Sequence, residues 1–163
     1  MNTLIDWLIG WPERVARHLE WLAPLFARIT VGYVFMLTGW GKLHNLPDIV
    51  DFFRQLGIPF PELQAPFVSS IELVCGGLVL AGLGTRLASV PLIGTMVVAI
   101  LTAVWPQLDT ARDLFGKEEL HYMALLAYLV VTGPGAVSLD ALIARRLDPA
   151  PLAARATMRP ARA

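Results

Sequence analysis

Two charged residues, Arg28 and Glu72, interrupt stretches of sequence that are otherwise apolar enough to lie in a lipid bilayer. By insertion scales, an Arg or Asp at the centre of a transmembrane helix costs about 2.5–3.5 kcal/mol, so such residues usually face the bundle interior and a partner. We expect Arg28 and Glu72 to pair, directly or through a water, across an axial offset of roughly 10 Å. The pair would either polarise or proton-couple a ligand, or fix the register of two helices as a structural ion pair.

A regular stripe of residues surrounds Arg28. Arg28, Gly32, Phe35, Gly39 and Lys42 are separated by four, three, four and three positions, which places them on one face of a helix. Because this stripe contains two charges and two glycines, it predicts the face that looks into a helix bundle.

A second stripe is expected on the last apolar stretch, and it consists of Glu118, His121, Tyr122, Leu125, Tyr128 and Thr132. It begins on the side of the membrane that also carries Lys42 and His44. We therefore predict a polar pocket that opens outward, with Lys42, Glu72, Glu118, His121 and Tyr122 as candidate ligand-binding or proton-coupling residues. The alternative is that Lys42, His44 and Glu118 are solvated anchors at helix ends, which is the commoner fate of charges at span ends.

A metal site is the weaker alternative. Glu118 and His121 have the i, i+3 spacing of carboxylate-bridged di-metal bundles, but such sites need two of these motifs and two further glutamates. His44, Glu118 and His121 would be the ligands to test. The single cysteine, Cys75, excludes an intrachain disulfide and CxxC redox chemistry.

The elements that must position these residues are membrane helices. The 163 residues are 56% hydrophobic and 16% charged, with a mean hydropathy of +0.60, whereas globular domains are about 25% charged. Four stretches have the length and composition to cross a bilayer: 22 to about 43, 65–84, 87–105 and 120 to about 137. The predicted fold is all-α, a four-transmembrane-helix bundle with flanking interfacial amphipathic helices.

The domain organisation follows from these spans. Residues 1–21 are predicted to form an N-terminal interfacial amphipathic segment, 22–147 the membrane domain and 148–163 a disordered basic tail. Eight basic residues lie on the side of the termini and four on the opposite side, so both termini are expected in the cytoplasm. The balance of 13 Lys+Arg against 13 Asp+Glu gives no reason to expect a nucleic-acid partner. Small residues at Gly77 and Ala81 predict close packing of the second and third spans.

Several short segments together resemble a known family. They are Arg28 through Phe35, Gly39-Trp40-Gly41-Lys42-Leu43, Leu56-Gly57-Ile58-Pro59, Glu72 with Gly76-Gly77, Gly82 through Ala88, Met96 to Ala99, Gly133-Pro134-Gly135 and Ser138-Leu139-Asp140. In this order and spacing, over residues 23–142, the chain resembles the DoxX family of four-helix membrane proteins.

The resemblance implies a small multi-pass subunit of a bacterial or archaeal inner membrane that works beside redox enzymes. The family takes its name from a subunit associated with a terminal quinol oxidase, and related proteins form part of a thiosulfate:quinone oxidoreductase. We therefore expect a quinone-interacting or accessory subunit of a respiratory or sulfur-oxidising complex. Its expected partners are the lipid bilayer and membrane or soluble redox-enzyme subunits, in a homo-oligomer or hetero-complex. A small-solute or metal transporter, or a structural anchor for a soluble partner, is the alternative.

Overall fold

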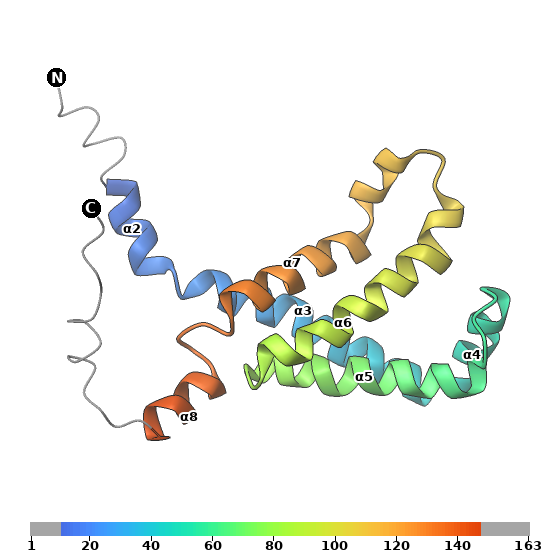
Figure 1. The fold of residues 1–163 in the computed structure, drawn as a ribbon, viewed down its shortest axis with the longest axis horizontal. Coiled ribbons are helices and arrows are strands. Elements are labelled where there is room, and N and C mark those ends of the chain that lie inside the picture. Colours follow the sequence, from blue (N-terminus) through green and yellow to red (C-terminus); the bar gives the residue numbers. More distant parts are fainter. Residues whose placement is uncertain (1–10, 148–163) are drawn as a thin grey trace.

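The computed structural model of the protein describes residues 11–147, and within this range every regular element is a helix. Figure 1 shows their arrangement. The α-helices are α2 (Trp11–Leu19), α3 (Leu22–His44), α4 (Leu46–Gln55), α5 (Pro61–Ala81), α6 (Thr85–Ala99), α7 (Glu118–Thr132) and α8 (Leu139–Leu147). The all-α prediction is confirmed.

Three segments have the length and hydropathy of membrane spans: Leu22–His44, Pro61–Ala81 and Thr85–Gln107. They agree with the first three predicted spans, so the chain has the architecture of a multi-pass membrane protein. The fourth predicted span contains α7, whose 15 residues extend about 22 Å against a hydrocarbon core of about 30 Å. Gly133 ends α7 with a φ of 84°. A fourth crossing therefore stays a prediction.

α3 and α5 form the most extensive helix pair in the structure. They approach closely because glycines lie where the two helices touch: a Cβ on Gly32 would lie 2.6 Å from the Leu80 nitrogen, and one on Gly76 would lie 2.6 Å from the Met36 nitrogen. Gly39 meets the backbone of Leu73 in the same way. The prediction that Gly77 lies in a close contact between the second and third spans is wrong, since a Cβ on Gly77 would meet nothing within 4 Å. Gly77 lies one position, or about 100°, away from the contact face.

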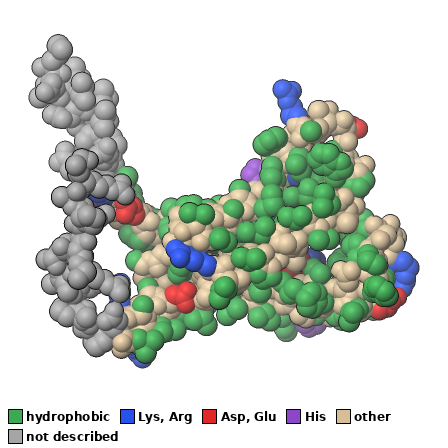
Figure 2. Space-filling model, in the orientation of Figure 1, with side chains coloured by type: hydrophobic (Ala, Val, Ile, Leu, Met, Phe, Trp, Pro, Cys, Tyr) green, Lys and Arg blue, Asp and Glu red, His purple; other side chains and the backbone are tan. Residues whose placement is uncertain are grey.

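The apolar core lies among α3, α5, α6 and α7, and its buried members include Val31, Phe35, Val79, Leu92 and Leu126. Many large apolar residues instead face outward, such as Leu87 at 82% and Val131 at 78% exposure. Figure 2 shows hydrophobic side chains spread over the visible face of the described part, between tan backbone and other atoms and with few charged groups. A continuous apolar exterior is what a helix bundle presents to lipid.

The flanking helices are present where the structure describes them. α2 covers the second half of the predicted N-terminal amphipathic segment, and residues 1–10 and 148–163 lie outside the described part of the chain. α8 has Asp140 in its first turn and Arg145 and Arg146 in its last turn, which suits the helix dipole. The Ser138 hydroxyl accepts a hydrogen bond of 3.1 Å from the Ala141 nitrogen, so Ser138 caps α8.

The third span departs from a regular α-helix at its end. After Ala99 it continues as a π-helical turn, η2 (Ile100–Val104), and then as a 3₁₀ turn, η3 (Trp105–Gln107). A second 3₁₀ turn, η4 (Ala111–Gly116), leads into α7. In Figure 1, α5 and α6 lie together near their connection and diverge toward the end of the bundle that carries α4.

Candidate functional site

A buried ion pair joins α3 to α5. The Lys42 ammonium donates hydrogen bonds of 2.6 and 2.7 Å to the two carboxylate oxygens of Glu72. The Glu72 side chain is 2% exposed and the Lys42 side chain 31%, and Thr38 Oγ1 lies 3.4 Å from Glu72 Oε2. Lys42 follows Gly39 by three positions, so the close helix contact at Gly39 brings the lysine to the α5 turn that contains Glu72.

The predicted partner of Glu72 was wrong. Arg28 lies at the other end of α3, where its guanidinium donates to backbone carbonyls instead of a carboxylate. Its acceptors are Val79 at 3.1 Å, Leu80 at 3.0 Å, Pro134 at 2.8 Å and Val137 at 2.6 Å. The carbonyls at a helix C-terminus lack intrahelical partners and carry partial negative charge. The end of α5 therefore provides what a counter-ion would otherwise supply.

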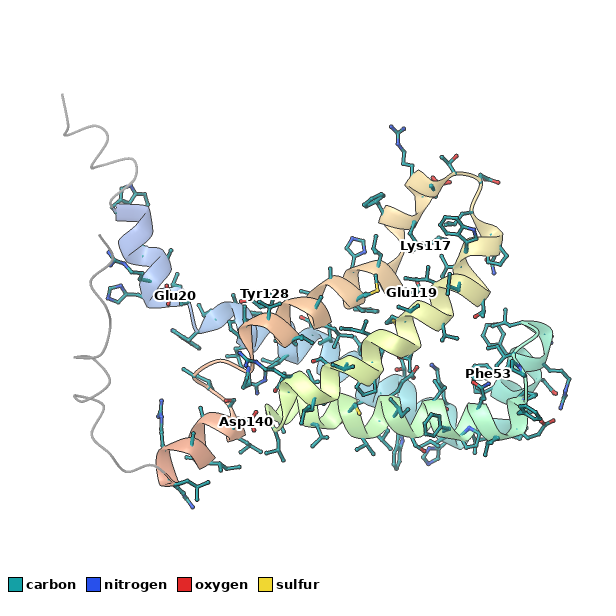
Figure 3. All side chains as sticks on the ribbon, viewed as in Figure 1. Glu20, Phe53, Lys117, Glu119, Tyr128 and Asp140 are labelled. Atoms are coloured by element: carbon teal, nitrogen blue, oxygen red, sulfur yellow. The ribbon has the colours of Figure 1, made fainter. Side chains whose placement is uncertain are left out.

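Gly82 makes this arrangement of Arg28 possible. It has a left-handed φ of 73°, and the Leu83 nitrogen donates back to the Leu78 carbonyl at 2.9 Å, which ends α5. A Cβ on Gly82 would lie 2.6 Å from the Arg28 guanidinium. The Gly82 carbonyl also accepts from the nitrogen of Asp140, labelled in Figure 3 at the start of α8, and Asp140 Oδ1 accepts from the Gly84 nitrogen. Arg28 thus connects the end of α5 to the segment between α7 and α8 by hydrogen bonds.

A cavity of about 470 Å³ lies beside the Lys42–Glu72 pair. Its walls come from α4, α5, α6 and η2, at the end of the bundle where α5 and α6 diverge. Phe52, Phe53 and Phe67 contribute aromatic rings to the lining, which is otherwise mostly aliphatic. Besides the ion pair, Gln64, Thr95 and Thr102 are the polar residues of the lining. We refer to this space as the Lys42 cavity.

The helix α4 closes one side of the Lys42 cavity. It begins with a proline at the helix start and Asp48 in its first turn, and it ends with Arg54 in its last turn. Arg54 forms ion pairs with Asp51 on α4 and, at 2.7 Å, with Glu62 on α5. The hydrogen bond from Arg54 to Glu62 raises the pKa of the Arg54 guanidinium above its ordinary value. This exposed network holds α4 beside the start of α5.

The predicted polar face of α7 does not reach the cavity. Glu118 and His121 are exposed, and the residues that α7 buries are Leu126 and Leu129. Of the predicted stripe, Tyr122 and Leu125 pack against the core, whereas Glu118, His121, Tyr128 and Thr132 are exposed.

The remaining predicted residues make local contacts. Tyr122 is half-buried, and its ring meets the Phe35 ring edge-on, with 5.9 Å between the ring centroids. The Tyr122 hydroxyl donates a 3.2 Å hydrogen bond to Glu118 Oε2. His121 Nδ1 lies 2.8 Å from the Lys117 carbonyl. His44 Nδ1 lies 2.8 Å from the Trp40 carbonyl, and its ring contacts the Trp40 ring. None of these side chains belongs to the described lining of the Lys42 cavity.

The predicted metal ligands are not brought together. Residues 11–147 contain no group of three or more His, Cys, Asp or Glu side chains placed to hold a metal ion. His44, on α3, and His121, on α7, each make a contact within their own helical segment.

Sequence reasoning missed Gln64, Thr95 and the aromatic wall. Gln64 precedes Glu72 by eight positions on the same helix, which is a spacing with no recognisable motif. The aromatic residues of α4 lie between the first two predicted spans, in a segment too short and too polar to cross a bilayer. The one usable signal was the amphipathic pattern of that segment, which has apolar Ile49, Phe52 and Phe53 on the cavity side.

The Lys42–Glu72 pair leaves one hydrogen-bond donor free at the Lys42 cavity. A lysine ammonium carries three N–H donors, and Glu72 accepts two hydrogen bonds from Lys42. The third donor has no acceptor among the described residues and is available to a ligand. An apolar cavity with few directed polar groups is the usual form of a small-molecule site.

Comparisons with known proteins agree with this architecture. The DoxX family model matches residues 23–105. The "Uncharacterized membrane protein Rv3486" of Mycobacterium tuberculosis is 34% identical over 150 residues, which cover 84% of this chain and 90% of the relative. The "Putative oxidoreductase CatD" of Bacillus subtilis is 29% identical over 75% of this chain and 87% of its own length. The "Inner membrane protein YphA" of Escherichia coli is 30% identical over 71% and 86%. No solved structure matches. The chain therefore belongs to the DoxX family of membrane proteins.

Proposed function

We propose that this protein is an inner-membrane subunit accessory to a redox-enzyme complex, and that it holds the headgroup of a quinone in the Lys42 cavity. The observation that carries the proposal is a lysine ammonium, neutralised by a buried carboxylate, at the edge of a cavity that is otherwise apolar and aromatic. Quinone oxygens are hydrogen-bond acceptors, and the free N–H of Lys42 is a donor that such an oxygen matches.

The cavity fits this class of ligand in size and lining. Small-molecule sites are usually about 300–1,000 Å³, and the Lys42 cavity has about 470 Å³. Phe52, Phe53 and Phe67 offer ring faces and edges on which a flat headgroup can pack. When bound, a quinone supplies two-electron carrier chemistry. The residues of this chain would bind and orient its headgroup and exclude water from it.

The family and its relatives support the redox setting. One relative is named an oxidoreductase, and two others are named inner membrane proteins. The names of these relatives support an inner-membrane location, and the four predicted spans with the distribution of basic residues favour both termini in the cytoplasm. The Lys42 cavity then lies toward the outer side, and the protein acts in a homo-oligomer or beside other redox subunits.

Binding of a short-tailed quinone tests the proposal directly. The protein is purified, reconstituted in lipid nanodiscs and titrated with decylubiquinone, and the dissociation constant is measured. Replacing Lys42 with Met removes a charged donor, which contributes about 1.5–3 kcal/mol to a hydrogen bond, so affinity is expected to fall about tenfold or more.

Lys117→Met is the matched control, because it makes the same chemical change outside the cavity lining. Its affinity is expected to match the wild type. No saturable binding by the wild type, or equal losses in the two variants, would contradict the proposed site. Flux of a small solute through sealed liposomes without quinone binding would support the transporter alternative instead.

A further inference from the structure

The Lys42 cavity reaches the outward faces of α5 and α6. Each helix carries an exposed stripe whose members are four, three and four positions apart, so each stripe follows one helix face. The stripe on α6 consists of Val90, Gly94, Val97 and Leu101, and the stripe on α5 of Leu63, Phe67, Ser70 and Val74. Gly94 and Phe67 also line the cavity. The cavity wall and the outward surface therefore share one residue on each helix.

Both stripes have the composition of a lipid-facing surface. Neither contains a charged residue. The single hydroxyl, on Ser70, donates a 2.7 Å hydrogen bond to the Pro66 carbonyl in its own helix. A polar group that is satisfied within its helix can face hydrocarbon. We therefore place the two stripes against lipid.

The level of Gly94 in its span shows what lies outside this part of the cavity. α5 ends at Ala81 and α6 begins at Thr85, on either side of one short turn. Glu72 precedes Ala81 by nine positions and Gly94 follows Thr85 by nine, so each lies about 14 Å from that turn. In a hydrocarbon core about 30 Å thick, this level is near the middle. Gly94 thus lies level with Glu72 and faces acyl chains.

Gly94 leaves space at this position. A Cβ on Gly94 would meet nothing within 4 Å, and its φ is not positive. Neither a close helix contact nor the backbone conformation therefore requires a glycine here, although glycine weakens a helix relative to alanine. The space lies beside the cavity, on the part of α6 that diverges from α5 (Figure 1).

We infer that the Lys42 cavity opens sideways into the bilayer, and that the hydrocarbon tail of its ligand passes between α5 and α6 beside Gly94. This inference rests on the proposed function and adds a path for the tail to the site of the headgroup. The polar ring lies at Lys42, and the tail continues past Gly94 and Phe67 into the lipid. Because the tail stays among acyl chains, the ligand binds without leaving the bilayer.

Two ligands that share a ring test the path of the tail. Decylubiquinone and the tailless dimethoxymethylbenzoquinone are titrated into nanodiscs, with concentrations expressed per lipid because the tail increases partitioning. Gly94→Trp places an indole where the tail passes, so affinity for decylubiquinone should fall about tenfold or more, as for two groups competing for one space. Affinity for the tailless ring should remain near the wild-type value. Gly94→Leu should give a smaller loss in the same direction.

Gly77→Trp is the matched control. Gly77 is a helical glycine at which a Cβ would also meet nothing within 4 Å, and it lies outside the described lining of the cavity. This variant should bind both ligands as the wild type does. Retained binding of the tailless ring also shows that Gly94→Trp is folded.

A measurement without ligand tests the opening itself. Cys75 is replaced with Ala, and a nitroxide is attached to Gly94→Cys in nanodiscs. Its collisions with oxygen, which concentrates in hydrocarbon, are compared with its collisions with a water-soluble nickel chelate. Oxygen should dominate at Gly94, as at a lipid-facing reference label on Val90→Cys, whereas the chelate should dominate at Asp109→Cys.

The outcomes separate this inference from the proposed function. Equal losses of both ligands in Gly94→Trp, or no loss of either, overturn the path of the tail and leave the headgroup site intact. A label at Gly94 that collides mainly with the nickel chelate overturns the opening to lipid. If the wild type binds neither ligand, the proposed quinone site is wrong, and the label alone decides whether the cavity opens to the bilayer.

Discussion

Lys42 and Glu72 form the ion pair that defines the site, with the ammonium 2.6 and 2.7 Å from the two carboxylate oxygens. The two partners differ in their surroundings, because Glu72 is 2% and Lys42 31% exposed. A buried carboxylate depends on its partner, whereas a partly exposed lysine can extend its charge toward water. The pair is therefore asymmetric.

This asymmetry predicts unequal effects of removing either partner. Lys42→Met leaves a buried, unpaired carboxylate and should lower the free energy of unfolding in detergent by about 3–5 kcal/mol. Glu72→Gln leaves an ammonium that can reach water and should cost less. The double variant should be milder than the sum of the single losses, because it leaves no uncompensated charge. Equal single losses that add in the double variant would mean that the pair contributes no coupling.

Arg28 and Glu72 should behave independently. The sequence led us to expect a pair, in which the double change Arg28→Met and Glu72→Gln would be milder than the sum. In the structure Arg28 donates to carbonyls at the end of α5, and Glu72 is paired with Lys42. We now expect the losses to add within about 0.5 kcal/mol, as for separated sites. A coupling well above this value, measured by the same unfolding experiment, would contradict the separation.

The outcome for these residues shows how far the sequence could predict the site. The spacing of Arg28, Phe35 and Lys42 identified the inward face of α3, since helical periodicity is a local property. The partner of each charge depends on where two helices cross, and that crossing is set by backbone contacts at glycines. Sequence spacing alone does not contain this information.

The same limit explains why the placement of the polar residues at the start of α7 and the local geometry at the end of the third span were not predicted. Polar residues at the start of α7 share a face by spacing, but the face that packs is set by Leu126 and Leu129 against the core. The π-helical turn at Ile100–Val104 has an ordinary apolar sequence. Thr102 in this turn lines the cavity, and the sequence carries no pattern that predicts a π-helical turn there.

The glycines at the α3–α5 contact predict a graded response to alanine. Gly32→Ala and Gly76→Ala each place a Cβ 2.6 Å from a backbone nitrogen of the other helix, so no side-chain rotation relieves the contact. We expect each to lower the free energy of unfolding by about 1–3 kcal/mol, as for overpacked sites.

Gly77→Ala is the matched control, since its Cβ meets nothing within 4 Å. It should be neutral, or stabilise the helix by up to about 1 kcal/mol. A loss at Gly77 as large as at Gly76, in the same detergent, would mean that the close helix contact does not decide the response.

The number of membrane crossings is the last prediction, because α7 is shorter than the other spans. A reporter placed near Asp109 follows three crossings, and one fused after Ala163 follows a fourth only if α7 and the residues after it cross the bilayer. The distribution of basic residues, eight against four, predicts a cytoplasmic C-terminus and an external Asp109. Alkaline phosphatase should therefore be active at Asp109 and green fluorescent protein fluorescent after Ala163. Labelling a cysteine that replaces Asp109 with a membrane-impermeant maleimide in intact cells checks this independently. The parent protein, with its half-buried Cys75, gives the background labelling.

If both reporters lie on one side, α7 does not cross. If Asp109 is cytoplasmic and the C-terminus external, the Lys42 cavity faces the cytoplasmic side, and its ligand must be exchanged with partners there.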